Sequence, residues 1–338
     1  MRLARLSRQS VDGAEPRIAV TSSARPGSWT DVRFAELLRH ERSGATTVAA
    51  RRLAAAIVPG SLTAALENGE AFLEAARRAA EDSSGDAVIA EQAELLAPAD
   101  PPAYRDFMVF EQHFVTGARL SGRDPARVLY ELPISYMGSA QAIVGPEAEI
   151  RWPSYSREID YELELGIVIA RTGSDLTPDE ALDHVLGVTI LNDFSARDIQ
   201  RREMEARLGP SKGKHFATAI GPVIVTLDEL DHQNLRMQAR INDESWSDGS
   251  TSTMFWSVAD IVAWASAGEP MAAGTLFGTG TVGGGCGLEL QKRLQPGDVV
   301  ELEIAGIGVL RNQVTGYSEP RWTPEPKKPR VWQPAATR

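Results

Sequence analysis

Two glutamates, Glu162 and Glu164, interrupt an apolar segment that is otherwise predicted to form a buried β-strand. Side chains alternate between the two faces of a strand. Both carboxylates therefore point the same way, roughly 7 Å apart, while Tyr161, Leu163 and Leu165 point the other way. Two like charges on one face of an apolar strand repel each other and lose hydration. A positive group is expected over them, and a divalent cation is the simplest candidate.

A third carboxylate follows a second apolar run. Residues 185–190 predict a strand, and Asp193 stands where this strand is expected to end. Carboxylate oxygens suit hard cations, so Mg²⁺, Mn²⁺ or Ca²⁺ is the expected cofactor.

Motifs around these carboxylates make the chain similar to the fumarylacetoacetate hydrolase superfamily. They are DFMVFEQH at 106–113, LPISY at 132–136, LNDFSARDIQ at 191–200, KGKHFAT at 212–218 and GDVVELE at 297–303. The resemblance covers residues 100–317, with the motifs in family order, and is weak before residue 100. It implies a metal held by four ligands: Asp106, Glu162, Glu164 and Asp193. An alternative role for Asp106 is to cap a helix that the apolar residues after it suggest.

His113 follows Asp106 by seven residues, a spacing that suits neighbouring turns of one helix or lid segment. The resemblance implies that His113 is the general base and that Glu289, on a predicted apolar strand, orients it. A carboxylate beside a histidine raises its basicity and fixes its tautomer. Thr116 stands where acylpyruvase and decarboxylase relatives place a glutamate, and this difference favours the hydrolase branch.

Three further side chains supply donors for an enolate or carboxylate: Arg197, Gln200 and Lys214. A helix starting at Asp193 would put Arg197 and Gln200 on the same face as that carboxylate. An ion pair of Arg197 with Asp198 or Glu203 is the structural alternative. Burial can lower the pKa of a lysine, which would let Lys214 exchange protons.

The resemblance also implies substrate contacts from Tyr136, Thr218 and Thr281. The predicted function is metal-dependent hydrolysis of a carbon–carbon bond in a β-diketo acid similar to fumarylacetoacetate or an acylpyruvate, by water that the His113–Glu289 pair activates. The alternative within the superfamily is a 2-oxo acid decarboxylase, hydratase or isomerase. A non-catalytic binding protein would be expected to lose the histidine, lysine or glutamate.

The predicted fold is a strand-rich α+β protein whose catalytic domain is a mixed β-sheet roll, as the resemblance implies. We expect strands at 162–170, 185–191, 222–227, 235–242, 299–304 and 307–314, and a helix at 253–266. The predicted regions are a small α/β region at 1–100, the catalytic domain at 101–318 and a proline-rich tail at 319–338.

The net charge and the hydropathy of the chain limit which classes of binding partner are expected. The formal charge of −11 disfavours nucleic acid, and no apolar run approaches the roughly 20 residues that span a bilayer. We expect a cytoplasmic homodimer, because family members usually pair through the catalytic domain. Residues 278–283 have the spacing of a dinucleotide-binding motif, but glycines and a predicted strand follow them, whereas such a motif needs a strand before it and a helix after it. The single cysteine, Cys286, is predicted to fill space, because no base is evident beside it.

Overall fold

A large mixed sheet runs through most of the chain in the computed structural model, which describes residues 1–10, 13–21, 27–82, 84–89 and 93–327. Its order is β4-β3-β2-β1-β14-β12-β11-β17-β6-β7, with β5 beside β1 and β8 beside β14. Its strands are β1 (Arg2–Ser10), β2 (Gly13–Thr21), β3 (Trp29–Asp31), β4 (Val88–Ile89), β5 (Glu94–Leu95), β6 (Tyr104–Phe107), β7 (Ser135–Gly138), β8 (Ile143–Val144), β11 (Leu163–Ile169), β12 (Val185–Asp193), β14 (Thr218–Val225) and β17 (Leu276–Gly278).

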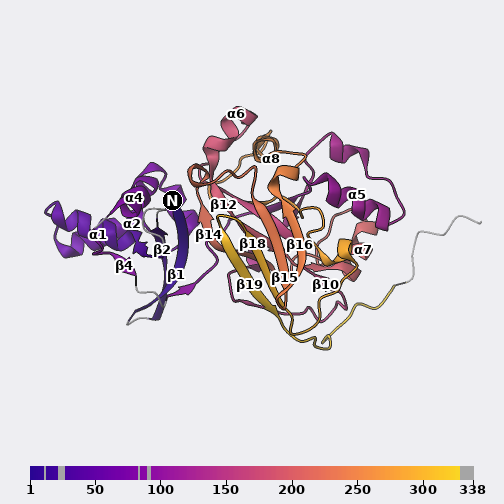
Figure 1. Cartoon of the computed structure of the whole chain (residues 1–338). Helices are drawn as coiled ribbons and strands as arrows, with labels where there is room; N and C mark the ends of the chain where they lie inside the picture. Colours follow the sequence, from indigo (N-terminus) through magenta and orange to yellow (C-terminus); the bar gives the residue numbers. More distant parts are fainter. Residues whose placement is uncertain (11–12, 22–26, 83, 90–92, 328–338) are drawn as a thin grey trace, which may run out of the picture.

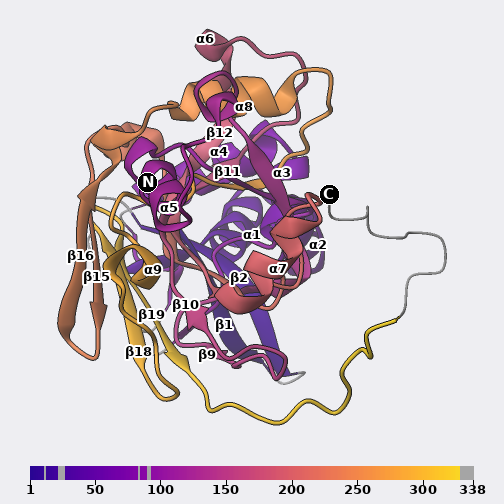
Figure 2. The same cartoon turned by 90° about the vertical axis from the view of Figure 1, so that its right-hand side faces the viewer.

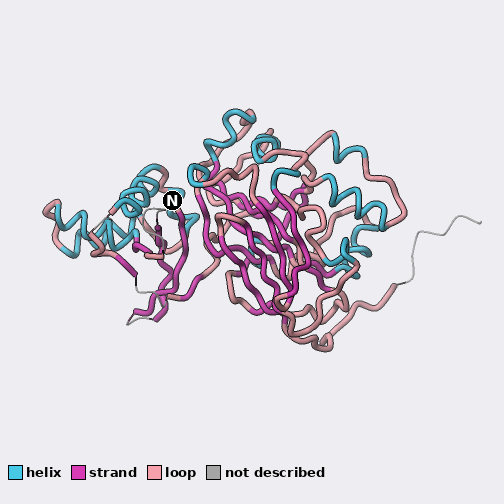
Figure 3. The backbone as a smooth tube through the Cα atoms, in the orientation of Figure 1, coloured by secondary structure: helices cyan, strands magenta, loops and turns pink. Residues whose placement is uncertain are grey.

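A second sheet packs against the first and completes a strand-rich body with helices at its periphery (Figures 1 and 3). Its order is β16 (Glu244–Ser250), β15 (Arg236–Ile241), β18 (Val299–Ile304), β19 (Gly308–Val314) and β9 (Glu149–Ile150). A short pair joins β10 (Ile159–Asp160) to β13 (Ser195–Ala196).

Strand β11 lies in the middle of the large sheet and has both faces buried. Its odd-numbered residues, such as Leu165 and Ile167, join one core cluster together with Met237 and Leu302 of the second sheet. Val168, on the opposite face, joins a separate cluster that packs on the N-terminal helices. The two-residue alternation therefore leaves Glu162 and Glu164 on the face away from the inter-sheet core.

Helices lie at several sides of this body, while strands β15, β16, β18 and β19 form an outer face of the described chain without a helix over it (Figure 2). The helices are α1 (Val32–Arg42), α2 (Thr47–Ile57), α3 (Leu62–Glu67), α4 (Glu70–Glu81), α5 (Glu111–Leu120), α6 (Pro178–Ala181), α7 (Arg197–Glu205), α8 (Val258–Ser266) and α9 (Gly287–Leu290), with 3₁₀ turns at Arg127–Tyr130, Ala140–Ala142, Leu182–His184, Leu227–Glu229 and Thr251–Thr253. Residues 315–327 contain neither helix nor strand. Within the described chain, we find no helix with the length and apolar character needed to cross a membrane.

The N-terminal region lies beside the rest of the chain and extends the same sheet (Figure 1). Strand β1 pairs with β14 through Arg2 opposite Val225 and Leu3 opposite Ile224. Helix α3 starts after Ser61, whose Oγ accepts a hydrogen bond from the backbone of Ala64, as its cap sequence predicts.

The strand-rich α+β prediction is confirmed, and each expected strand of the catalytic region exists with ends shifted by a few residues. The helix expected at 253–266 begins at Val258 instead, because Ser257 and Asp260 form a capping box that fixes its start. The division at residues 100 and 318 stays a prediction, and residues 328–338 of the predicted tail lie outside the described residues.

Candidate active site

Four buried carboxylates meet at the centre of the large sheet. They are Asp106 on β6, Glu162 just before β11, Glu164 on β11 and Asp193 at the end of β12, and one oxygen of each lies within 4.8 Å of one oxygen of every other. None is more than 4% exposed. The sheet order brings them together, because β12 and β17 flank β11 and β6 pairs with β17.

The glycine-rich segment after β17 forms one wall of this cluster. A β-carbon at Gly278 would lie 2.8 Å from Glu164 Oε2, so only glycine leaves room there. The backbone N–H of Gly280 donates to Asp106 Oδ1 at 3.2 Å and to Glu164 Oε2 at 3.1 Å. The glycines of residues 278–283 therefore bring backbone N–H donors close to the carboxylates.

The two strand glutamates have opposite electrostatic environments. Burial and the neighbouring carboxylates of Asp106, Glu162 and Asp193 raise the pKa of Glu164 well above its ordinary value. Burial alone would also raise the pKa of Glu162, but the charges of Lys214 and Arg197 outweigh it and lower that pKa. In the absence of a metal ion, positive groups of the described residues therefore compensate Glu162 but not Glu164.

This donor set fits a hard divalent cation. All four side chains offer carboxylate oxygens, the ligand type that Mg²⁺, Mn²⁺ and Ca²⁺ prefer. Glu164 Oε1 is buried and accepts no hydrogen bond from any described residue. An uncompensated buried carboxylate oxygen is costly unless a cation meets it. Asp106 lies on a strand rather than before a helix, so the capping alternative for it is wrong.

Three side chains expected to handle substrate converge on Asp193. Tyr136 donates its hydroxyl to Oδ2, Thr218 donates to Oδ1 at 3.2 Å, and Lys214 Nζ lies 2.8 Å from Oδ2. Lys214 also pairs with Glu162. Burial alone lowers the pKa of Lys214, but these carboxylates raise it above its ordinary value, so the expectation of a lowered pKa is wrong.

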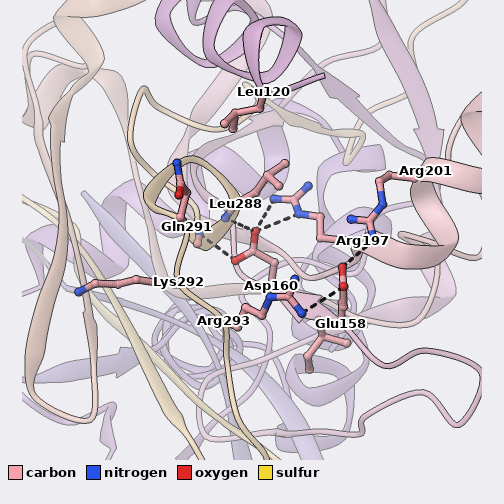
Figure 4. A pocket seen from close by; sticks show the side chains of 11 residues that line it. Leu120, Glu158, Asp160, Arg197, Arg201, Leu288, Gln291, Lys292 and Arg293 are labelled. Carbon is pink, nitrogen blue, oxygen red and sulfur yellow. Dashed lines mark hydrogen bonds and ion pairs between the residues drawn. The ribbon is translucent and has the colours of Figure 1, made fainter. Parts of the chain in front are cut away.

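Arg197 forms the floor of a cavity of about 360 Å³ next to the cluster (Figure 4). Its Nε and Nη2 donate to Asp160 Oδ2 at 2.9 and 2.7 Å, and Nη1 donates to Glu162 Oε1 at 2.7 Å and to Gln200 Oε1 at 3.0 Å. The alternative ion pairs of Arg197, with Asp198 or Glu203, do not form.

Helix α7 begins at Arg197 rather than at Asp193, so the expected common helix of these residues is wrong. Asp193 closes strand β12, and a short bridge with β10 separates it from the helix. Arg197 and Gln200 nevertheless share one helix face, as their mutual hydrogen bond requires.

His113 and Glu289 form a close pair at the edge of the cluster. His113 Nδ1 lies 2.6 Å from Glu289 Oε1, and Glu289 Oε2 accepts the N–H of Gly284 at 3.1 Å. The charge of His113 contributes to lowering the pKa of Glu162, so the ring lies near this carboxylate. With Nδ1 donating to Glu289, Nε2 carries the lone pair of the neutral ring.

Two local expectations about this pair are wrong. His113 lies on α5 whereas Asp106 lies on β6, so they do not share a helix. Glu289 lies on the short helix α9 rather than on a strand. Residue Thr281 is buried as well, and its hydroxyl has no hydrogen-bond partner among the described residues.

Two features were not predicted from the sequence: the part that Asp160 takes in the site and the carboxylate beside Cys286, which is fully buried. Asp160 is 3% exposed and accepts hydrogen bonds from Arg197 and from the backbone of Gly287 and Leu288 (Figure 4). It stands two residues before Glu162, so the same alternation could have placed it on the carboxylate face. Cys286 does have acid–base neighbours, because its Sγ lies 3.6 Å from Glu289 Oε1.

Comparisons with known proteins show which proteins this chain is similar to. Residues 103–315 match the family model described as the C-terminal part of fumarylacetoacetate (FAA) hydrolase. The chain is 29% identical over 270 residues to an oxaloacetate tautomerase of Bacillus subtilis, covering 76% of this chain and 87% of that one. It is 33% identical over 265 residues to a mitochondrial oxaloacetate tautomerase of Homo sapiens, covering 76% and 80%.

A solved structure named as a fumarylacetoacetate hydrolase, from Exiguobacterium antarcticum, superposes with a TM-score of 0.65 at 28% identity, covering 93% of this chain and 99% of that one. The roll architecture expected from the sequence is therefore confirmed.

Proposed function

Because the chain belongs to the fumarylacetoacetate hydrolase superfamily, we propose that it is a metal-dependent tautomerase of a small 2-oxo acid. The reaction moves one proton between the carbon beside the keto group and the keto oxygen. The observation that carries the proposal is the placement of a histidine base, His113, and a retained ammonium, Lys214, at the same buried carboxylate cluster. The oxaloacetate tautomerase names of the two relatives support it over the hydrolysis expected from sequence.

The cation would be held by Asp106, Glu162, Glu164 and Asp193. A divalent cation bound there supplies Lewis-acid stabilisation of negative charge on substrate oxygens.

His113 would carry the proton. Its Nε2 accepts the proton from the carbon as the C–H bond breaks, and the electron pair becomes the C=C bond while charge moves to the keto oxygen. The same N–H then returns the proton to that oxygen, so no water is consumed. Glu289 holds the ring through Nδ1 and stabilises the transient imidazolium.

Lys214, Arg197 and Gln200 would bind rather than transfer protons. The raised pKa of Lys214 favours an ammonium that donates a hydrogen bond to the developing oxyanion without losing its proton. Tyr136, Thr218 and Thr281 would contact the remainder of the substrate, and the buried hydroxyl of Thr281 has no hydrogen-bond partner among the described residues.

Carbon–carbon hydrolysis is the second candidate, supported by Thr116 and by the similarity to the Exiguobacterium hydrolase. Hydrolysis consumes one water molecule, whereas tautomerisation consumes none. A nucleophilic water would need His113 to take its proton, whereas tautomerisation uses the same nitrogen on a carbon acid.

Two measurements test the proposal. The first is the exchange of oxaloacetate protons for deuterium in D₂O with Mg²⁺, monitored by nuclear magnetic resonance. The second is the decay of the ultraviolet absorbance of the enol. We expect both rates to exceed the uncatalysed rates, and both gains to vanish in His113→Ala. His184→Ala is the matched control, because His184 lies on a distant 3₁₀ turn and its Nδ1 contacts the carbonyl of Arg171.

A parallel incubation with acylpyruvates, analysed by mass spectrometry, tests the second candidate. Cleavage products that carry the mass of one added water, without any acceleration of oxaloacetate exchange, would reject the tautomerase and favour hydrolysis.

A further inference from the structure

A second group of ligand side chains lies beside the carboxylate cluster and includes the single cysteine of the sequence. His113, Cys286 and Glu289 each place one ligand atom within 4.8 Å of the other two. They offer one nitrogen, one sulfur and one oxygen, whereas the carboxylate cluster offers oxygen alone. A mixed set of this kind suits Zn²⁺ and similar borderline ions better than Mg²⁺.

The distances are close to those of a tetrahedral zinc site. Zinc bonds of about 2.3 Å to sulfur and about 2.0 Å to oxygen place these two ligands roughly 3.5 Å apart. Cys286 Sγ and Glu289 Oε1 are 3.6 Å apart. His113 Nδ1 and Glu289 Oε1 are 2.6 Å apart, so they would need to separate by less than about 1 Å. Three protein ligands leave a fourth position for water or substrate.

A thiolate at Cys286 requires the bound ion. Burial raises the pKa of the Cys286 thiol well above its ordinary value, and the charge of Arg197 opposes that rise. The carboxylates of Asp160, Glu162 and Glu289 add to the rise. A coordinating zinc ion deprotonates a thiol outright. Cys286 also pairs through its backbone with Glu162, so the sulfur is held next to the carboxylate cluster.

We propose that His113, Cys286 and Glu289 form an inhibitory binding site for Zn²⁺ or a chemically similar ion, separate from the carboxylate site. The ion would bind His113 Nδ1, the Cys286 sulfur and the Glu289 carboxylate. The ring proton of His113 would move from Nδ1 to Nε2 and the thiol proton would go to solvent, so Nε2 would no longer accept the substrate proton. The inhibition rests on the proposed function of His113, whereas binding of the ion does not.

Cobalt binding tests the site itself. We would titrate Co²⁺ into the full chain with Mg²⁺ in excess and record the thiolate-to-Co²⁺ charge-transfer band. Cys286 is the only cysteine, so such a band reports this sulfur alone. We expect saturation at one equivalent, loss of the band on adding Zn²⁺, and no band in Cys286→Ser. No band in the unmodified protein, or an unchanged band in the variant, would overturn the proposal.

Inhibition is measured next, with each variant compared with its own zinc-free rate. We expect the Zn²⁺ concentration for half-inhibition to rise at least about tenfold in both Cys286→Ser and Cys286→Ala, because a ligand is lost. If excess Mg²⁺ relieved inhibition equally in all three proteins, zinc would act at the carboxylates and the inhibitory role would be wrong. If no tautomerase activity is found at all, the cobalt band still decides whether the ion site exists.

Discussion

Lys214 Nζ lies 2.8 Å from Asp193 Oδ2, and the same ammonium pairs with Glu162. The chain itself thus compensates two of the four clustered carboxylates. Asp106 and Glu164 share a side-chain hydrogen bond with each other, and both accept the backbone N–H of Gly280. The cluster therefore has one half that the protein neutralises and one half that depends on an added cation.

Glu164→Gln should have opposite effects with and without metal. Without metal it removes a buried like charge, so we expect a higher melting temperature than that of the unmodified protein. With Mg²⁺ or Mn²⁺ we expect at least about 100-fold weaker binding and little thermal stabilisation by the ion. Calorimetric titration and thermal melts measure both, with the exposed Glu74→Gln as the control. Full metal affinity in Glu164→Gln would contradict the assignment of this ligand.

The free energy of unfolding should depend on pH in the metal-free protein and much less in the metal-bound protein. The pKa values of Glu164 and Asp106 are raised above their ordinary 4.5 and 3.8, so the native metal-free protein binds more protons than the unfolded chain above those values. Its free energy of unfolding should therefore fall as the pH rises from about 4.5. With saturating metal this fall should disappear, because the ion binds the ionised carboxylates.

Below pH 4.5, Glu162 makes the free energy of unfolding change in the reverse direction. Its folded pKa is lowered, so its stabilisation is complete above 4.5 and is lost as the pH falls toward that lowered value. Melting temperatures from pH 3 to 8, with chelator and with Mg²⁺, check both trends. Parallel curves for the two forms would show that the cluster does not hold the ion.

Lys214→Met should lower turnover by roughly 10²–10³-fold, the usual contribution of one preorganised donor to a developing oxyanion. Metal binding should persist, since removing a cation from the cluster strengthens its attraction for another. Lys212→Met is the matched control, because Lys212 is exposed and its Nζ stacks on the ring of Tyr155 at 4.7 Å. Equal losses in the two variants would point to a general effect of charge on this loop.

His113→Ala and Glu289→Gln should act on one function and therefore be non-additive. We expect His113→Ala to lower turnover by roughly 10²–10⁴-fold, and the double variant to be little slower than His113→Ala alone. A double-mutant cycle on the rate of proton exchange measures the coupling. Effects that simply add would contradict the interpretation of the 2.6 Å contact as a working pair.

Much of this site could be predicted because its signals are local. Charges at alternate positions of an apolar strand indicated Glu162 and Glu164, and the end of the next apolar run indicated Asp193. The family motifs supplied Asp106 and His113. The local secondary structure of Glu289 could not be predicted. Residues 287–290 form a helix because Asp160, far away in the sequence, accepts the N–H groups of its first turn.

The direction of the pKa shift of Lys214 also could not be predicted from the sequence. Burial and ion pairing shift the pKa of a lysine in opposite directions, and only the positions of Asp193 and Glu162 decide which prevails. The choice between tautomerisation and hydrolysis could not be made from the sequence either, because both reactions would use His113 and the same four carboxylates.

The pairing of β1 with β14 bears on how the chain can be divided for experiments. Strand β14 lies next to β12, which carries Asp193, and its Val225 end is covered by β1. A truncated chain without the N-terminal region would leave these backbone groups open to another molecule. We expect such a fragment to self-associate through this sheet edge. Removal of the first hundred residues should therefore give an aggregated protein, and activity assays of such a fragment would report aggregation and not catalysis.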